Sequence, residues 1–141
     1  MSQIPAVLIT GASTGIGATY AERFARRGHD LVLVARDAVR MEALASRLRQ
    51  ETGAAIDILQ ADLTKAEDLV KVETRLRDDE RIGVLVNNAG TAIGGTFVDQ
   101  NADDMTKLVA LNATALVRLA SAIAPRLANA GEGAIVNIGS V

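Results

Sequence analysis

The sequence predicts an α/β fold in which a parallel five-stranded sheet of order 3-2-1-4-5 is covered by helices on both faces. Short apolar runs alternate with helical apolar patterns along all 141 residues, which is typical of strand–helix–strand units. A glycine-rich stretch, TGASTGIG, joins the first apolar run directly to the first helical pattern. Because crossovers between parallel strands are right-handed, the strands and helices form one doubly wound, Rossmann-like domain over residues 1–141.

The expected strands are short apolar segments, and the first of them contains Val7, Leu8 and Ile9 in succession. Continuous runs of this kind suit strands that are buried on both faces of a sheet. Ligands bind at the carboxyl ends of strands in doubly wound sheets, and the unusual residues of this chain follow the strands. The predicted strands are Ala6–Thr10, Leu31–Ala35, Ala55–Gln60, Val84–Asn87 and Ala134–Ile138.

The first helix is predicted to begin near Gly15, with Ile16, Tyr20 and Phe24 repeating every fourth residue on its apolar face and Ala21 and Ala25 alongside them. Tyr20 is the only tyrosine, and its place on this face indicates core packing rather than catalysis. His29 is the only histidine, and we expect it to be exposed in the following loop.

Side chains that can cap helix N-termini mark the other helices. Asp37 is the expected N-cap of the second helix, and Thr64 with Glu67 has the spacing of a capping box for the third. The fourth helix is expected to start at Asn101 and to run to about Leu127, where a nearby proline kinks or closes it.

The composition restricts the chemistry. There are 15 Lys and Arg against 17 Asp and Glu, and a net charge of −2 provides no basic surface for nucleic acid. The chain has no cysteine and one histidine, which excludes thiol catalysis and predicts no metal site. It has no signal-peptide pattern and no uninterrupted 18-residue apolar run, so we expect a cytoplasmic protein without a membrane segment.

The glycine-rich turn predicts a phosphate site. It directs free backbone N–H groups and the positive end of the helix dipole toward the sheet edge, which suits a pyrophosphate. Gly11 permits the sharp turn, Gly15 lets a phosphate approach, and Gly17 allows the helix to pack tightly on the strand. A plain tight turn is the alternative, because the spacing G-x-x-x-G-x-G departs from G-x-G-x-x-G. The residues expected at the phosphates are Gly11, Ser13, Thr14, Gly15, Ile16 and Gly17.

The stretch TGASTGIG resembles the cofactor loop of the short-chain dehydrogenase/reductase family. Further matches follow in the family's order: AR after the second strand, DLT after the third, NNAG after the fourth, Asn112 in the long helix and IVNIGS on the fifth strand. These matches span the whole chain, and their order makes the resemblance highly specific. It implies an NAD(P)-dependent oxidoreductase that acts on a small-molecule alcohol or carbonyl substrate.

The end of the second strand bears on the choice of cofactor. A carboxylate there would accept hydrogen bonds from both ribose hydroxyls of NAD, but Ala35 occupies the position and Arg36 follows it. A guanidinium can pair bidentately with a 2′-phosphate, so NADP is favoured over NAD. The alternative is a solvated arginine at a helix start, since Asp37 comes directly after it.

Further cofactor contacts are expected at the ends of the third and fourth strands. The carboxylate of Asp62 can accept from the adenine amino group while Leu63 packs on the ring. In NNAG, Asn87 and Asn88 end a buried strand and can tie it to neighbouring loops, while Ala89 and Gly90 leave room for backbone near the nicotinamide ribose. The cofactor contacts expected in this loop are Asn88, Ala89 and Gly90. Ordinary turns also use Asp, Asn and Gly, so these assignments depend mainly on the resemblance.

Two polar residues match the family's catalytic positions. Asn112 stands within an apolar helical segment, and the matching family residue perturbs the helix and holds a water linked to the catalytic lysine. Ser140 follows the fifth strand, and the matching family serine donates a hydrogen bond to the substrate oxygen. The alternatives are a core hydrogen bond for Asn112 and an ordinary polar strand end for Ser140.

The tyrosine and lysine that complete the family's site, spaced Tyr-x-x-x-Lys, have no match among the 141 residues. We therefore expect the cofactor half of an NADP-dependent reductase, with the carboxy-terminal part of the family fold absent and the chain alone inactive. A non-catalytic NADP(H)-binding module is the alternative, while Arg36 and NNAG count against a methyltransferase. Apolar residues on several sides of the long helix predict a homo-oligomer.

Overall fold

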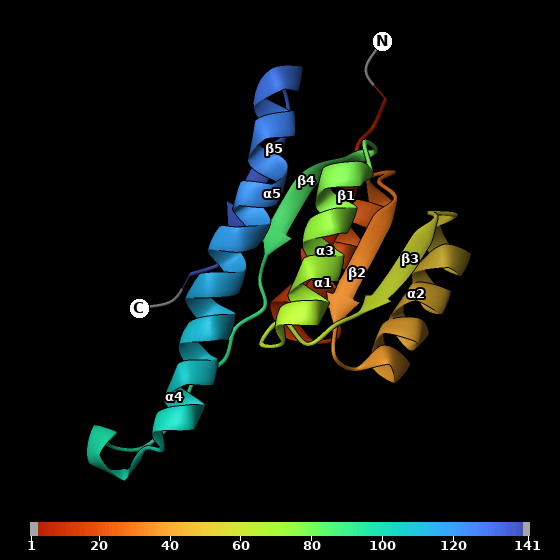
Figure 1. Ribbon diagram of the computed structural model, residues 1–141. Helices are drawn as coiled ribbons and strands as arrows, with labels where there is room; N and C mark the ends of the chain where they lie inside the picture. Colours follow the sequence, from red (N-terminus) through yellow and green to blue (C-terminus); the bar gives the residue numbers. More distant parts are fainter. Residues whose placement is uncertain (1–2, 140–141) are drawn as a thin grey trace.

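Five parallel strands form one sheet in the order β3-β2-β1-β4-β5, as the sequence predicts (Figure 1). The structure is a computed structural model that describes residues 3–139. In the register of the central strands, Leu8 lies opposite Val32 on one side and Leu85 on the other. The strands are β1 (Ala6–Thr10), β2 (Leu31–Ala35), β3 (Ile56–Gln60), β4 (Ile82–Asn87) and β5 (Ala134–Asn137).

Strand β4 begins at Ile82, earlier than the predicted start at Val84. Ile82 pairs with Ala6 of β1, and the register is irregular at this point. Gly83 interrupts the apolar pattern by which a strand is recognised in the sequence. A Cβ on Gly83 would lie 2.7 Å from the Cβ of Pro5, so close packing explains why this strand residue lacks a side chain.

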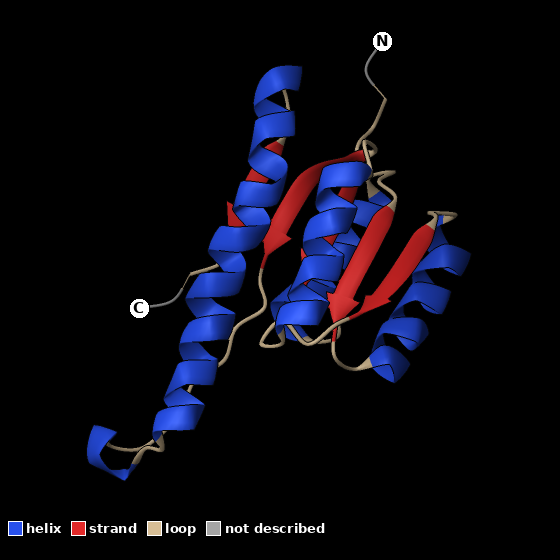
Figure 2. Cartoon of the chain, viewed as in Figure 1, coloured by secondary structure: helices blue, strands red, loops and turns tan. Residues whose placement is uncertain are grey.

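Helices cover both faces of the sheet (Figure 2). One layer consists of α1 (Gly15–Arg26) and α2 (Ala38–Thr52). The opposite layer consists of α3 (Ala66–Asp78) and one long helical segment. That segment is preceded by a short 3₁₀ helix, η1 (Phe97–Asp99), and comprises α4 (Ala102–Val109), the π-helical turn η2 (Ala110–Thr114) and α5 (Ala115–Ala130).

Each face of the sheet has its own apolar core, because the side chains of a strand alternate between the two faces. In β1, Leu8 belongs to the core under α3 and α5, whereas Val7 and Ile9 belong to the core under α1 and α2. All five residues of β1 are buried. Strand β1 is thus packed on both faces, so the position of its last residue, Thr10, is fixed, and the glycine-rich turn begins there.

The predicted apolar face of α1 is confirmed except at its start: Ala21 and Ala25 are buried and Tyr20 and Phe24 pack against the core, whereas Ile16 does not. Ile16 is 55% exposed, while Tyr20 and Phe24 are half-buried with their rings stacked. His29 is half-buried rather than exposed: its Nδ1 lies 2.7 Å from the carbonyl oxygen of Pro5, and its ring meets Phe24 edge-on. Small side chains let α1 approach the sheet more closely than large ones would. Its buried residues are Gly17, Ala21 and Ala25.

The capping box predicted for α3 is not formed. The Thr64 hydroxyl donates to Asp62 Oδ1 at 2.6 Å, and Lys65 occupies the N-cap position without a side-chain cap. Asp68, rather than Glu67, reaches back from the first turn and accepts from the backbone N–H of Asp62 at 2.8 Å. The prediction was wrong because a local turn competes for the threonine hydroxyl.

The long helical segment begins as predicted, with Asn101 Oδ1 accepting from the backbone N–H of Asp103 at 2.7 Å. It continues to Ala130 rather than ending near Leu127. Pro125 lies inside α5 and does not end it. The departure from regular α-helix comes earlier, at the π-helical turn η2.

By length and composition alone, the segment Ala102–Ala130 could cross a membrane, which the sequence analysis did not expect. Core helices of soluble proteins pass the same test. Here Leu119 and Ile123 are buried in the core under α3. Arg118 pairs with Glu73 of α3, whose side chain is almost fully buried. These contacts join α5 to the sheet domain, and 22% of the apolar 18-residue window in this segment is buried.

Candidate functional site

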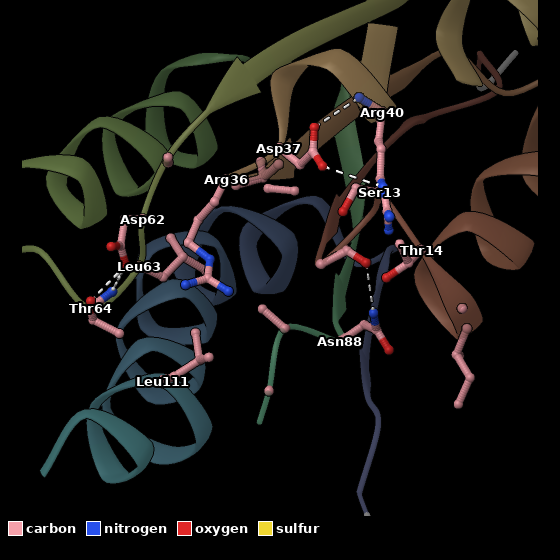
Figure 3. Close-up of a pocket in the computed structure, with 18 residues that line it drawn as sticks. Ser13, Thr14, Arg36, Asp37, Arg40, Asp62, Leu63, Thr64, Asn88 and Leu111 are labelled. Carbon is pink, nitrogen blue, oxygen red and sulfur yellow. Dashed lines mark hydrogen bonds and ion pairs between the residues drawn. The ribbon is translucent and has the colours of Figure 1, made fainter. Parts of the chain in front are cut away.

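A hollow of about 750 Å³ lies at the carboxyl ends of the central strands, between the glycine turn and the loops after β2, β3 and β4 (Figure 3). Leu111 of η2 also lines it, a contact that the sequence did not indicate. Gly17 and Asn112 lie outside the lining, and Ser140 lies outside the described residues. The predicted residues that line the hollow are Gly11, Ser13, Thr14, Gly15, Ile16, Arg36, Asp62, Leu63, Asn88, Ala89 and Gly90.

The surroundings of Gly15 and Gly17 explain why the turn has glycine at these two positions. Gly15 has φ +56°, and a Cβ there would meet nothing within 4 Å, so the backbone at this point faces open space. Gly17 lies on the packed side, where a Cβ would stand 2.1 Å from the carbonyl oxygen of Gly11. Any side chain at Gly17 would separate the helix from the turn. These surroundings agree with the predicted roles, which are room for a ligand at Gly15 and tight packing at Gly17.

The N-terminus of α1 is open toward a ligand. Thr14 occupies the N-cap position but makes no side-chain cap, and the first turn contains no acidic residue. The first N–H groups of a helix lack partners within the helix, and together with the helix dipole they attract an anion. This end of α1 can therefore bind a phosphate group without displacing a protein side chain.

Two arginines, rather than the one predicted, line the hollow beyond β2. Arg36 directly follows the strand, and Arg40 lies in the first turn of α2. Asp37 lies between them, accepting from the backbone N–H of Arg40 at 3.0 Å and pairing with its Nε at 3.4 Å. Arg40 was missed because an arginine near a helix start usually faces solvent. The available signal was its place three residues after Asp37, the predicted N-cap, which puts Arg40 in the first turn of the helix that follows β2.

Asp62, at the end of β3, is an ionised acceptor beside an apolar surface. The hydrogen bond from the Thr64 hydroxyl is the main cause that lowers the pKa of Asp62, against the effect of burial. The backbone N–H of Thr64 and the charges of Arg36 and Lys65 also lower this pKa. Both bonds from Thr64 go to Oδ1. Leu63 is 5% exposed and provides the apolar surface next to the carboxylate.

The loop after β4 is fastened to the glycine turn by Thr10 and Asn88. The buried Thr10 hydroxyl accepts from the backbone N–H groups of Asn88 at 3.0 Å and Ala89 at 2.9 Å. The Asn88 side chain donates to the carbonyls of Thr10 and Gly11. Its amide nitrogen thus supports the turn, as the sequence analysis allowed for a strand-ending asparagine. Thr10 itself was missed, because a threonine at the end of a strand carries no distinctive signal.

Asn112 also holds the loop after β4. Its Oδ1 accepts from the backbone N–H of Thr91 at 2.8 Å, and its Nδ2 donates to the Thr91 carbonyl at 2.7 Å. A Cβ on Gly90 would lie 3.0 Å from this Oδ1, so the glycine makes room for the contact. Asn112 lies in the π-helical turn and is exposed.

Strand β5 is tied to β4 at the same edge of the sheet. Asn87 Nδ2 donates to Asn137 Oδ1 at 3.2 Å and, at 3.4 Å, to the carbonyl of Leu116 in α5. These contacts hold the end of β5 beside β4. Within residues 3–139 no group of carboxylates and histidine is arranged to hold a metal ion.

Comparison with known proteins gives consistent matches. The sequence profile of the short chain dehydrogenase family matches residues 5–141. Serine 3-dehydrogenase of Agrobacterium fabrum is 38% identical over 137 residues, which covers 96% of this chain and 53% of that protein. Human 17-beta-hydroxysteroid dehydrogenase type 3 is 34% identical over 136 residues, covering 94% of this chain and 43% of the relative.

Solved structures extend the likeness to the fold. A short-chain dehydrogenase from Sphingobium yanoikuyae in complex with NADPH is 67% identical, with a TM-score of 0.96, over 98% of this chain and 54% of that one. The bulky-bulky ketone specific alcohol dehydrogenase from Comamonas testosteroni is 64% identical, with a TM-score of 0.97, over 99% of this chain and 56% of that one. The chain therefore spans about half the length of the proteins it matches.

Proposed function

The chain belongs to the short-chain dehydrogenase family, and from this premise we propose that its hollow binds NADP(H) for hydride transfer to and from a carbonyl or alcohol substrate. The observation that carries the proposal is the uncapped first turn of α1, which faces open space at Gly15. Arg36 and Asp62 line the same hollow. An anion-binding helix terminus, a cationic neighbour and a hydrogen-bond acceptor are what a phosphorylated dinucleotide requires.

In the proposed arrangement, the pyrophosphate lies at the first turn of α1 and the hydroxyls of Ser13 and Thr14 donate to phosphate oxygens. The adenine lies against Leu63, with its amino group donating to Asp62. Arg36 pairs with the 2′-phosphate, so NADP(H) binds more tightly than NAD(H). The Sphingobium yanoikuyae neighbour, which holds NADPH and is 67% identical, supports this choice of cofactor.

The nicotinamide end is assigned to the loop after β4. Ala89 and Gly90 carry little side-chain bulk, which leaves their backbone accessible to the ribose. Asn112 fixes the next residue, Thr91, through two hydrogen bonds. We assign Asn112 to positioning this loop, in addition to the water-holding role that the family pattern implies for it.

When bound, NADP(H) supplies or accepts the hydride. Ser140 is assigned to donate a hydrogen bond to the substrate oxygen, where negative charge develops as a ketone is reduced. A separate group must deliver the proton to that oxygen, and Tyr20 is not that group, because it stacks on Phe24 in α1. By analogy with the Comamonas testosteroni neighbour, we propose a ketone and the corresponding secondary alcohol as the substrate pair.

The test uses the protein at its full natural length. Calorimetric titration is expected to show NADP⁺ binding more tightly than NAD⁺, with about a tenfold or larger loss for NADP⁺ in Arg36→Ala. NADPH oxidation should follow addition of a bulky ketone and should fall by about 100-fold in Ser140→Ala. If neither nucleotide binds, or if Arg36→Ala leaves the preference unchanged, the proposal is wrong.

A further inference from the structure

We propose that Arg40 is a second specificity-determining residue for NADP(H), acting with Arg36 on the 2′-phosphate, and that Asp37 orients it. The inference rests on the proposed function, because it concerns the adenosine end of the same hollow. It adds a residue that the sequence pattern did not indicate. It also makes a separate prediction about the net charge of Arg36, Asp37 and Arg40.

The two arginines reach the hollow from different elements. Arg36 follows β2 directly, whereas Arg40 stands one helical turn further on in α2. In Figure 3, Arg36 extends toward Leu63, while Arg40 extends toward Ser13 and Thr14 of the glycine turn. A phosphate on the ribose between these positions would have a guanidinium on either side of it.

Asp37 determines which atoms of Arg40 can take part. Its Oδ1 caps the helix by accepting from the backbone N–H of Arg40 at 3.0 Å. Its Oδ2 pairs with Arg40 Nε at 3.4 Å, which leaves the two terminal nitrogens for a ligand. Those two nitrogens form the fork that binds phosphate oxygens in pairs. The Arg40 side chain is 64% exposed, so it can reach a ligand without breaking buried contacts.

The same ion pair removes an unfavourable charge. Asp37 lines the hollow as an anion, and a 2′-phosphate carries nearly two negative charges at neutral pH. With Arg40 present, the formal charge of Arg36, Asp37 and Arg40 together is positive. Without Arg40 the cluster is neutral and the carboxylate is left unpaired beside the phosphate. Arg40 thus acts in two ways, by attracting the phosphate and by neutralising Asp37.

This double role makes a distinctive prediction for a pair of variants. Arg40→Ala should weaken binding of NADP⁺ and of 2′,5′-ADP by about tenfold and leave NAD⁺ and 5′-AMP unchanged. Asp37→Asn combined with Arg40→Ala restores the positive charge and keeps a good N-cap, so it should recover about half of the loss on a logarithmic scale. Arg40→Lys should retain most of the affinity, because the charge remains.

The experiment is calorimetric titration of these four nucleotides into the full-length protein. Arg47→Ala is the matched control, since Arg47 lies on the same helix but pairs with Glu22 and Glu51 away from the hollow. Thermal unfolding of each variant separates weakened binding from misfolding. The expected result is selective loss in Arg40→Ala and partial recovery in the double variant. No change in Arg40→Ala, or equal loss for NAD⁺, would overturn the inference.

Failure of this inference can be told from failure of the proposed function. If wild-type protein binds no nicotinamide nucleotide, the proposed function fails, and the role of Arg40 fails with it. If Arg36→Ala loses NADP⁺ affinity while Arg40→Ala behaves as wild type, only the role of Arg40 is refuted.

Discussion

Asn112 and Thr91 are joined by two hydrogen bonds in which the side-chain amide of Asn112 pairs with both backbone groups of Thr91. The pair connects a π-helical turn on one face of the sheet to the loop that follows β4. It reproduces the pattern of two neighbouring backbone strands, with a side chain in place of one strand. The loop beside Gly90 is thereby fixed although its own residues are exposed.

Substituting Asn112 should affect the two ends of the cofactor differently. Asn112→Ala removes both bonds to Thr91, and we expect it to lower the unfolding free energy by about 1 kcal/mol. Binding of 2′,5′-ADP should be unchanged, because that fragment does not reach the loop after β4. The affinity for NADP⁺ and the turnover rate should both fall. Chemical denaturation and calorimetry measure these effects, with Asn129→Ala, an exposed asparagine on α5, as the control.

Gly17 should be the least replaceable glycine of the turn. In Gly17→Ala the new Cβ would clash with the Gly11 carbonyl, and we expect a loss of about 3 kcal/mol or more of unfolding free energy. Gly15→Ala meets open space and suffers only from its positive φ, about 1 kcal/mol. Gly94→Ala, with nothing within 4 Å, is the control. Equal stability of the first two variants in urea denaturation would contradict this account of the turn.

Asp62 should contribute to both cofactors alike, in contrast to Arg36. Asp62→Ala is expected to weaken NADP⁺ and NAD⁺ by the same factor of about five, since the adenine is common to both. The lowered pKa of Asp62 keeps the carboxylate ionised at neutral and mildly acidic pH. The factor should therefore be constant from about pH 5 to 8. A loss confined to NADP⁺ would place Asp62 at the 2′-phosphate instead.

Asp79 should contribute stability that depends on pH. Hydrogen bonds from Arg81, and next from Arg75, hold the pKa of Asp79 well below its usual range, although burial opposes them. The pKa of the unfolded chain is higher, about 3.9, so this contribution is complete above that pH and is lost as the pH falls further. Asp79→Asn should cost about 1–2 kcal/mol at pH 7, and the cost should shrink at pH 3. Asp78→Asn is the exposed control, and a gap independent of pH would contradict the assignment.

Association of the chain remains a prediction. Val109 is 56% exposed and Val117 is 58% exposed on the long helical segment. Apolar side chains of this size on one helix favour contact with another copy. We expect sedimentation to show a dimer or larger assembly at tens of micromolar, and Val117→Asp to shift it toward monomer. A wild-type monomer under these conditions would contradict the prediction.

The sheet could be predicted because its signals are long-range and redundant. Five apolar runs that alternate with helical patterns predict a doubly wound parallel sheet, and no single residue decides this prediction. Local competition was harder to foresee. The hydroxyl of Thr64 can cap a helix or bond Asp62, and the sequence carries no measure of which bond is stronger. The start of β4 was also missed, because Gly83 interrupts the apolar pattern. The glycine is needed there for close packing against Pro5.

The site residues could be predicted where the backbone conformation requires a particular residue type. They could not be predicted where an exposed side chain lines the hollow. Gly11, Gly15 and Gly17 are constrained by the turn itself, so their pattern is visible in the sequence. Arg40 is an exposed arginine like many others, and only its distance from Asp37 distinguishes it. The π-helical turn η2 depends on how a whole helix packs, which no short window of sequence records.

Thr10 gives the hollow a fixed span. Its buried hydroxyl accepts from the loop after β4, and the Asn88 side chain of that loop donates to the carbonyls of Thr10 and Gly11, so the loop and the glycine turn are held together. The distance between the two ends of the hollow is thus set by the strands and does not depend on a bound nucleotide. The proposed NADP(H) would have to span this distance, because hydrogen bonds within the protein fix it.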